Sequence, residues 1–101
     1  MSLDWDNVKN KYRNGALVSF IAGGKKFKVT KVTDDEVFVS TPANPNAPIK
    51  RENLERMVML IETKRVSTEL ATLTDDYRTL VEDNRATSAI SILKDLGYIK
   101  P

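Results

Sequence analysis

Apolar and polar residues follow two rhythms along the chain, and each rhythm predicts a different kind of element. Near the N-terminus Trp5, Val8 and Tyr12 recur at helical spacing. This spacing predicts a short helix over residues 2–13. Gly15 follows it, and glycine ends helices because it adopts the left-handed cap conformation without steric cost.

From residue 16 onward, β-branched and aromatic residues alternate with polar ones. Segments 16–22 and 25–32 flank a Gly-Gly pair and predict a β-hairpin, and segment 37–41 predicts a third strand. Residues 42–48 contain three of the four prolines and predict a loop, because proline can neither donate to a strand ladder nor sit inside a helix. Residues 49–50 can return briefly to the sheet as a fourth strand.

Helical spacing returns in the second half of the chain. It predicts one helix over residues 51–64, a second that starts at an N-capping Ser67 and runs to about Glu82, and a third that Gly97 closes. The pattern therefore predicts one α+β domain over residues 1–101. Its parts are a helix (1–15), an antiparallel β-meander of three or four strands (16–50), and helices packed on that sheet (51–101).

Composition narrows the range of functions. The chain of 101 residues has no Cys and no His, which excludes Ser-His-Asp and Cys-His catalytic sites, zinc sites of those residue types and disulfides. The triplet Asp34, Asp35 and Glu36 is typical of a solvated turn, so we expect no metal site and no cofactor. An enzyme would need a concave pocket that gathers several carboxylates, and the pattern does not indicate one. We expect a non-enzymatic protein.

Charge is unevenly distributed although its sum is only +2. Residues 1–31 hold seven Lys or Arg and two acids, a local charge of +5, whereas residues 32–62 hold three Lys or Arg and six acids, a local charge of −3. A basic surface built from the first region could face an anionic partner. No apolar run reaches the ~18 residues of a membrane span, and we expect a cytoplasmic protein.

The last third of the chain carries the most informative pattern. A helical segment from Ser67, a polar turn at Asp83-Asn84 and a helix with small polar residues before aliphatic ones (RATSAISILKDLGYI) resemble the end of a winged helix-turn-helix protein. The resemblance implies double-stranded DNA as partner, because the N-terminal part of a recognition helix carries short donors. The implied contacts come from Arg85, Thr87, Ser88 and Ser91, with Lys94 near the backbone. A plain helical hairpin has the same pattern.

The basic strand offers an additional contact surface. Lys26 and Lys28 alternate with apolar residues, so they share the outer face of the strand, and Lys25 lies at the Gly-Gly turn. Lysines at every second position are about 6.6 Å apart, close to the phosphate separation along one DNA strand. Lysine on an outer strand also prevents sheets from pairing, which is a purely structural role.

The layout of strands followed by a helix that opens Ile-Lys-Arg-x-x-Leu (Ile49 to Leu54) is similar to small domains that accompany bacterial defence and mobile-element proteins. Layout alone assigns no activity. The sequence thus predicts a DNA-binding protein of regulatory or accessory type. The alternative is a protein-interaction module or homodimer that associates through its apolar helices or an open strand edge. Trp5 and Tyr12 could stack on bases, but their shared face with Val8 favours the core.

Overall fold

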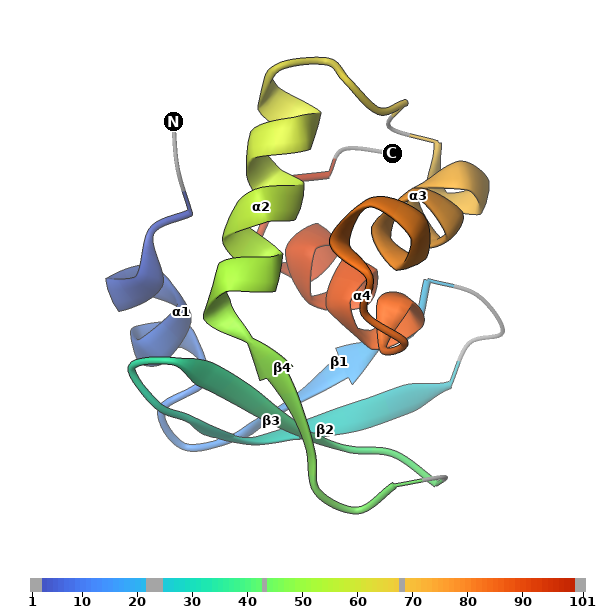
Figure 1. Cartoon of the computed structure of the whole chain (residues 1–101). Coiled ribbons are helices and arrows are strands. Elements are labelled where there is room, and N and C mark those ends of the chain that lie inside the picture. Colours follow the sequence, from blue (N-terminus) through green and yellow to red (C-terminus); the bar gives the residue numbers. More distant parts are fainter. Residues whose placement is uncertain (1–2, 22–24, 43, 68, 100–101) are drawn as a thin grey trace.

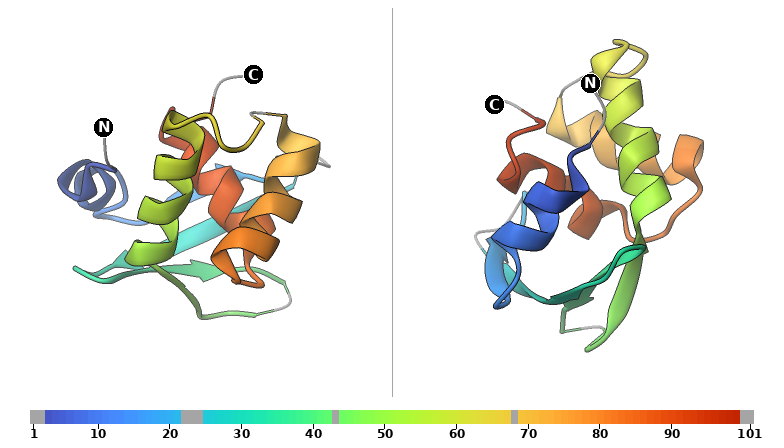
Figure 2. Two further views of the ribbon diagram at one scale, coloured as in Figure 1. Left: turned by 45° about the horizontal axis from the view of Figure 1, so that its top comes forward. Right: turned by 90° about the vertical axis from the view of Figure 1, so that its left-hand side faces the viewer.

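The structure is a computed structural model and describes residues 3–21, 25–42, 44–67 and 69–99. It consists of an N-terminal helix, a four-stranded antiparallel sheet and C-terminal helices, which is the α+β class that the sequence predicts. Figures 1 and 2 show the C-terminal helices on one face of the sheet and the N-terminal helix beside it. The elements are α1 (Trp5–Lys11), β1 (Ala16–Ser19), β2 (Lys26–Val32), β3 (Glu36–Ser40), β4 (Ala47–Lys50), α2 (Arg51–Glu62), α3 (Leu70–Asp76), a π-helical turn η1 (Tyr77–Val81) and α4 (Ala86–Asp95).

The four strands pair in sequence order, β1-β2-β3-β4, as an antiparallel meander. Side chains alternate between the two faces of each strand, so every second residue points to the helices. These inward residues are apolar and buried, and they are Val18, Phe27, Val29, Val37, Val39, Ala47 and Ile49. The other face is not covered by any helix in the described parts of the chain (Figure 2). This face is called the outer sheet face below.

The fourth strand is longer than the two residues that the sequence predicted. It begins at Ala47 and includes Pro48, a residue assigned above to the proline loop. Pro48 is accommodated because β4 is an edge strand, whose second side needs no backbone donor. The first strand is shorter than predicted and ends at Ser19. The predicted Gly23-Gly24 turn lies outside the described residues.

The C-terminal half begins as predicted and then differs in two details. Helix α3 starts at Leu70 with Glu69 as its N-cap, because Ser67 instead uses its hydroxyl to accept a hydrogen bond from the Glu69 N–H, at 3.2 Å. The helix then widens into the π-helical turn η1 and ends at Glu82, whose φ is +61°. A left-handed residue cannot continue a right-handed helix, so the chain turns here toward α4.

Helix α4 occupies the centre of the helical layer. It contacts β1, α2, α3 and η1, and seven of its ten residues are buried. After α4 the chain reverses at Gly97, whose φ is +90°, and the Tyr98 N–H donates to the carbonyl of Leu93 at 3.0 Å. The Tyr98 hydroxyl accepts from the Asp4 N–H, which ties the two ends of the chain together.

Candidate nucleic-acid interface

The residues that the sequence assigned to a DNA-reading helix do not share one exposed face. Thr87 and Lys94 are exposed, and the Arg85 side chain is 38% exposed. Ser88 and Ser91, however, are only 9% and 1% exposed. The expectation that both serines face solvent is therefore wrong. The Arg85 guanidinium also lies 4.0 Å from the carboxylate of Asp83, which reduces the positive charge that it presents.

Ser91 has a structural role instead. Its hydroxyl donates to the carbonyl of Thr87 at 2.6 Å and accepts from the backbone N–H of Ile21 at 3.1 Å. Ile21 follows β1, so this pair of hydrogen bonds fastens the end of the first strand to the central helix. The side chain is small enough to let helix and strand approach closely. Ser91 of α4 therefore serves helix–sheet packing.

The lysines of β2 lie where the sequence placed them, on the outer sheet face. Lys28 stands between Leu17 of β1 and Ser40 of β3, and Lys26 stands opposite Ser19. Both lysines are exposed, and neither makes an ion pair within the described part of the chain. Lys25 is also exposed, directly before the strand. Since α4 covers the opposite face, the structure does not bring these lysines and the α4 residues onto one surface (Figure 1).

A fourth cation joins this face through a β-bulge. The register between β2 and β3 shifts between Val29 and Lys31, so Thr30 is an extra residue and Lys31 pairs with Phe38. Strict alternation would have turned Lys31 toward the core. The bulge turns it outward, where its ammonium lies 5.7 Å from the centre of the Phe38 ring. Sequence reasoning missed Lys31, although a lysine at an inward position already indicates that the alternation breaks there.

The basic area continues from β2 onto the N-terminal helix. Arg13 and Lys31 line one hollow of about 550 Å³ between the end of α1 and β2, together with Lys9 and the single acid Asp6. Lys9 is already paired with Asp34, whereas Arg13 is exposed and makes no ion pair among the described residues. Arg13 therefore extends the positive charge of the outer sheet face around its edge.

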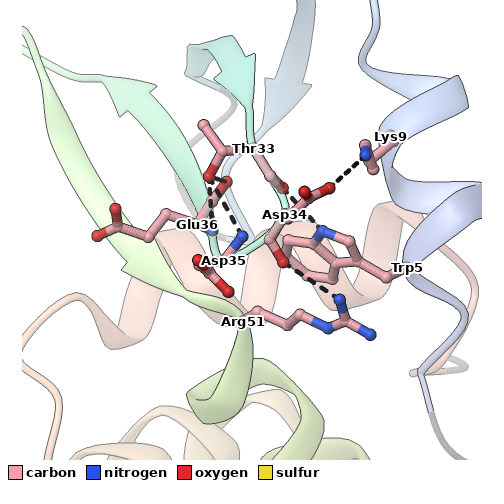
Figure 3. A network of polar contacts seen from close by, with 7 residues as sticks. All are labelled: Trp5, Lys9, Thr33, Asp34, Asp35, Glu36 and Arg51. Carbon is pink, nitrogen blue, oxygen red and sulfur yellow. Dashed lines mark hydrogen bonds and ion pairs between the residues drawn. The ribbon is translucent and has the colours of Figure 1, made fainter.

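The acidic triplet after β2 is used to hold the turn between β2 and β3 (Figure 3). The Thr33 hydroxyl accepts from the backbone N–H groups of Asp35 and Glu36, at 3.3 and 3.0 Å. Asp34 pairs with Lys9, and its hydrogen bond to that ammonium holds the pKa of the carboxyl below its usual range. Within the described residues no group of three metal-ligating side chains is arranged to hold an ion.

Trp5 belongs to the same network. Its indole N–H donates to the carbonyl of Thr33 at 2.8 Å, and the Arg51 guanidinium lies 5.1 Å from its ring centre. Figure 3 shows the indole between the turn and Arg51. The Arg51 guanidinium donates a hydrogen bond of 3.2 Å to the Asp34 carbonyl. Trp5 and Tyr12 are only 4% and 0% exposed, so the expectation that they pack in the core is confirmed.

Two buried tyrosines each donate a hydrogen bond from the core to a carboxylate. The Tyr12 hydroxyl donates to the carboxylate of Asp95 at 2.7 Å, and the Tyr77 hydroxyl donates to that of Asp83 at 2.6 Å. Burial, strengthened by these bonds to an anion, raises the pKa of both phenols far above the ordinary 10.0. Both rings are fully buried, so neither can contact a ligand.

Comparison of the chain with protein-family models, with curated proteins and with solved structures finds no match. Among the described residues no helix combines the length and the apolar character of a membrane span. The surfaces of this chain are therefore the features that can indicate its function. Of these, the outer sheet face combines exposed cations with the absence of a covering helix in the described structure.

Proposed function

We propose that the protein is a non-enzymatic nucleic-acid-binding protein that contacts the phosphate backbone through its outer sheet face. The observation that carries the proposal is the set of Lys26, Lys28 and Lys31, which project from one strand and make no ion pair in the described part of the chain. Lysines contact phosphates as mobile point charges, and they do so without reading sequence.

The surroundings of these lysines support a polyanion as ligand. Their cross-strand neighbours are Ser19, Leu17, Ser40 and Phe38, none of which is acidic. The acids near the sheet gather beyond Lys31, at the β2–β3 turn and the start of α2, where Glu36, Glu52 and Glu55 line a hollow of about 460 Å³ with Asp35 and two cations. A bound strand would therefore lie along β2 and away from the start of α2, because like charges repel it there.

This proposal keeps the predicted DNA partner and changes the surface. Arg85 and Thr87 remain accessible at the start of α4, but that helix is central to the helical layer and cannot enter a groove along its length. A recognition helix needs an exposed face over two or three turns. The buried residues of α4 leave only Thr87, Lys94 and Asp95 exposed.

The test is fluorescence anisotropy with labelled 12-nucleotide single strands and 12-base-pair duplexes, between 50 and 200 mM salt. Three phosphate contacts predict that affinity falls about 20-fold for a single strand and about 40-fold for a duplex over this range, through counterion release. The double variant Lys26→Gln/Lys28→Gln should bind weakly and flatten the salt dependence. The matched control Arg56→Gln/Arg65→Gln removes the same charge from exposed positions on and just after α2.

Two results would overturn the proposal. One is the absence of binding to either oligonucleotide at 50 mM salt and micromolar protein. The other is an equal loss of affinity in the lysine variant and in the control variant, because that result would assign the binding to net charge alone.

The alternative function, a protein-interaction module, has one observation in its favour. Met59 of α2 and Leu80 of η1 are 52% and 43% exposed, and the two elements that carry them are in contact. A contiguous exposed apolar patch is typical of association surfaces, and these two side chains are the candidates for one. Self-association through this surface would be supported if the molar mass of the wild-type protein in solution rises with protein concentration. The double variant Met59→Gln/Leu80→Gln should then stay at the monomer mass.

A further inference from the structure

Phe38 is an aromatic side chain on a face that no helix covers in the described structure. It lies at the middle of β3, between Lys31 of β2 and Pro48 of β4. Its neighbours along the strand, Val37 and Val39, are 0% and 1% exposed and point into the core. Alternation therefore directs the Phe38 ring outward, where it is partly exposed.

Cations lie beside this ring, and the one acid that the alternation of β3 places on the same face, Glu36, stands opposite Lys50 of β4. The Lys31 ammonium is 5.7 Å from the ring centre, and Lys28 lies on the same strand opposite Ser40, two residues from Phe38. The ring and the lysines thus combine a flat apolar surface with positive charge. Proteins that bind single-stranded nucleic acid without sequence preference use this combination, with bases stacked on aromatic rings and phosphates held by cations.

We propose that the outer sheet face binds single-stranded nucleic acid, with one base stacked on Phe38 and the adjacent phosphates held by Lys26, Lys28 and Lys31. The inference rests on the proposed function and adds the state of the nucleic acid and the residue that contacts a base. A duplex cannot offer its base faces to Phe38, since they are stacked on each other. A duplex is therefore the weaker ligand for this face.

A nucleic-acid base gains more binding free energy on the Phe38 ring than the Lys31 ammonium does. Stacking of a base on an aromatic side chain strengthens binding about 5- to 150-fold, whereas an exposed lysine over a ring gains only about 2- to 5-fold. A base can therefore displace the Lys31 ammonium from Phe38. The displaced ammonium remains on the same face and becomes available to a phosphate.

The charge of the outer sheet face also favours a nucleic-acid strand over a second copy of the chain as its ligand. If two outer sheet faces packed together, the three lysines of each copy would be brought close to those of the other, and the one carboxylate that β3 contributes to the face, Glu36, already stands opposite Lys50 of its own copy. Like charges placed opposite each other across an interface oppose association. A nucleic-acid strand supplies bases that can stack on Phe38 and phosphates that can pair with the lysines.

The experiment compares three ligands, namely an oligothymidylate of eight nucleotides, an abasic oligonucleotide with the same number of phosphates, and a duplex of eight base pairs. Phe38→Leu keeps an apolar side chain without a ring and should weaken oligothymidylate binding at least 5-fold. It should leave the salt dependence and the affinity for the abasic strand unchanged. Phe38→Trp should preserve or strengthen binding, and the fluorescence of its new indole should be quenched by the bound base.

The matched control is Leu17→Ser, which changes an apolar residue on the same face that is 67% exposed and should alter affinity less than 2-fold. Thermal unfolding of each variant confirms that the sheet is intact. Equal binding of the abasic strand and oligothymidylate, with salt dependence retained, would overturn stacking and leave the proposed function standing. Tighter binding of the duplex, or dimerisation that Phe38→Leu abolishes, would overturn the inference as well. Failure of all three ligands to bind would overturn both proposals.

Discussion

Replacing Ser91 by alanine separates a structural role from a role in binding. The Ser91 hydroxyl accepts from the Ile21 N–H at 3.1 Å and donates to the Thr87 carbonyl at 2.6 Å. In the alanine variant the Ile21 N–H loses its partner, whereas the Thr87 carbonyl keeps the backbone bond that an α-helix gives it. We expect lower stability and unchanged affinity for nucleic acid.

The size of the effect follows from these two bonds. Removing the partner of a buried donor costs about 1–3 kcal/mol, and because Ile21 is partly exposed the cost is about 1.5 kcal/mol. Alanine has the higher helix propensity and returns about 0.5 kcal/mol. The net loss is about 1 kcal/mol of the free energy of unfolding, which lowers the midpoint of thermal unfolding by about 4–8 °C in a chain of this length.

The control is Ser88→Ala in the same helix. Ser88 is also buried, at 9% exposure, but its hydroxyl has no hydrogen-bond partner among the described residues. The Ser88→Ala variant should gain the same ~0.5 kcal/mol of unfolding free energy from helix propensity, and it should lose no hydrogen bond. Circular dichroism during thermal and urea unfolding measures the difference, and anisotropy measures binding. Equal stability of the two variants would refute the structural role, and a loss of affinity in either folded variant would restore the serines as contact residues.

Two further pairs of variants test the backbone and the buried phenols. Both Gly15 and Gly97 have a positive φ, so alanine at either position should lower the free energy of unfolding by about 1 kcal/mol. Gly15→Ala should lower it further in urea unfolding, because only there would the new Cβ meet a backbone carbonyl, that of Val29, at 3.1 Å. Because burial raises the pKa of Tyr12 and Tyr77, these phenols ionise above pH 10 only in the unfolded chain. Their contribution to stability is therefore constant below that pH and is lost above it. Tyr12→Phe or Tyr77→Phe should each reduce this alkaline slope by about 1.4 kcal/mol per pH unit, measured as unfolding free energy between pH 9 and 11.5.

The sequence predicted the order and type of the elements because their apolar residues repeat at clear spacings. The meander was readable from alternation, and α1 and α2 were readable from the apolar faces of their sequences. The extent of β4 could not be predicted from the sequence. Proline is excluded from central strands but allowed in edge strands, and only the pairing of β4 with β3 alone shows that β4 is an edge strand. The start of α3 was missed because Ser67 can accept a hydrogen bond in a turn as well as in a helix cap.

The positions of the candidate interface residues in the fold were predicted in part. Lys26 and Lys28 were placed correctly because their strand alternates without interruption up to Val29. Serines 88 and 91 were misplaced because a small hydroxyl is compatible both with water and with close packing against a strand. Lys31 was missed because a bulge changes which face a residue occupies, and a bulge is defined by pairing between two strands rather than by either strand alone. The outward position of Phe38 follows from the regular alternation of its strand, so the sequence contained this signal.

The bulge at Thr30 also explains how one strand serves both the core and the surface. Before it, Phe27 and Val29 point inward while Lys26 and Lys28 point outward. Without it, Lys31 would continue the inward series of Phe27 and Val29 and bury a charge beside Val37, a cost that proteins avoid by pairing or by moving the group to water. The extra residue moves Lys31 outward to Phe38. The same local change that protects the core thus places the third cation beside the exposed ring, so that stability and the proposed binding surface depend on one irregularity of the sheet.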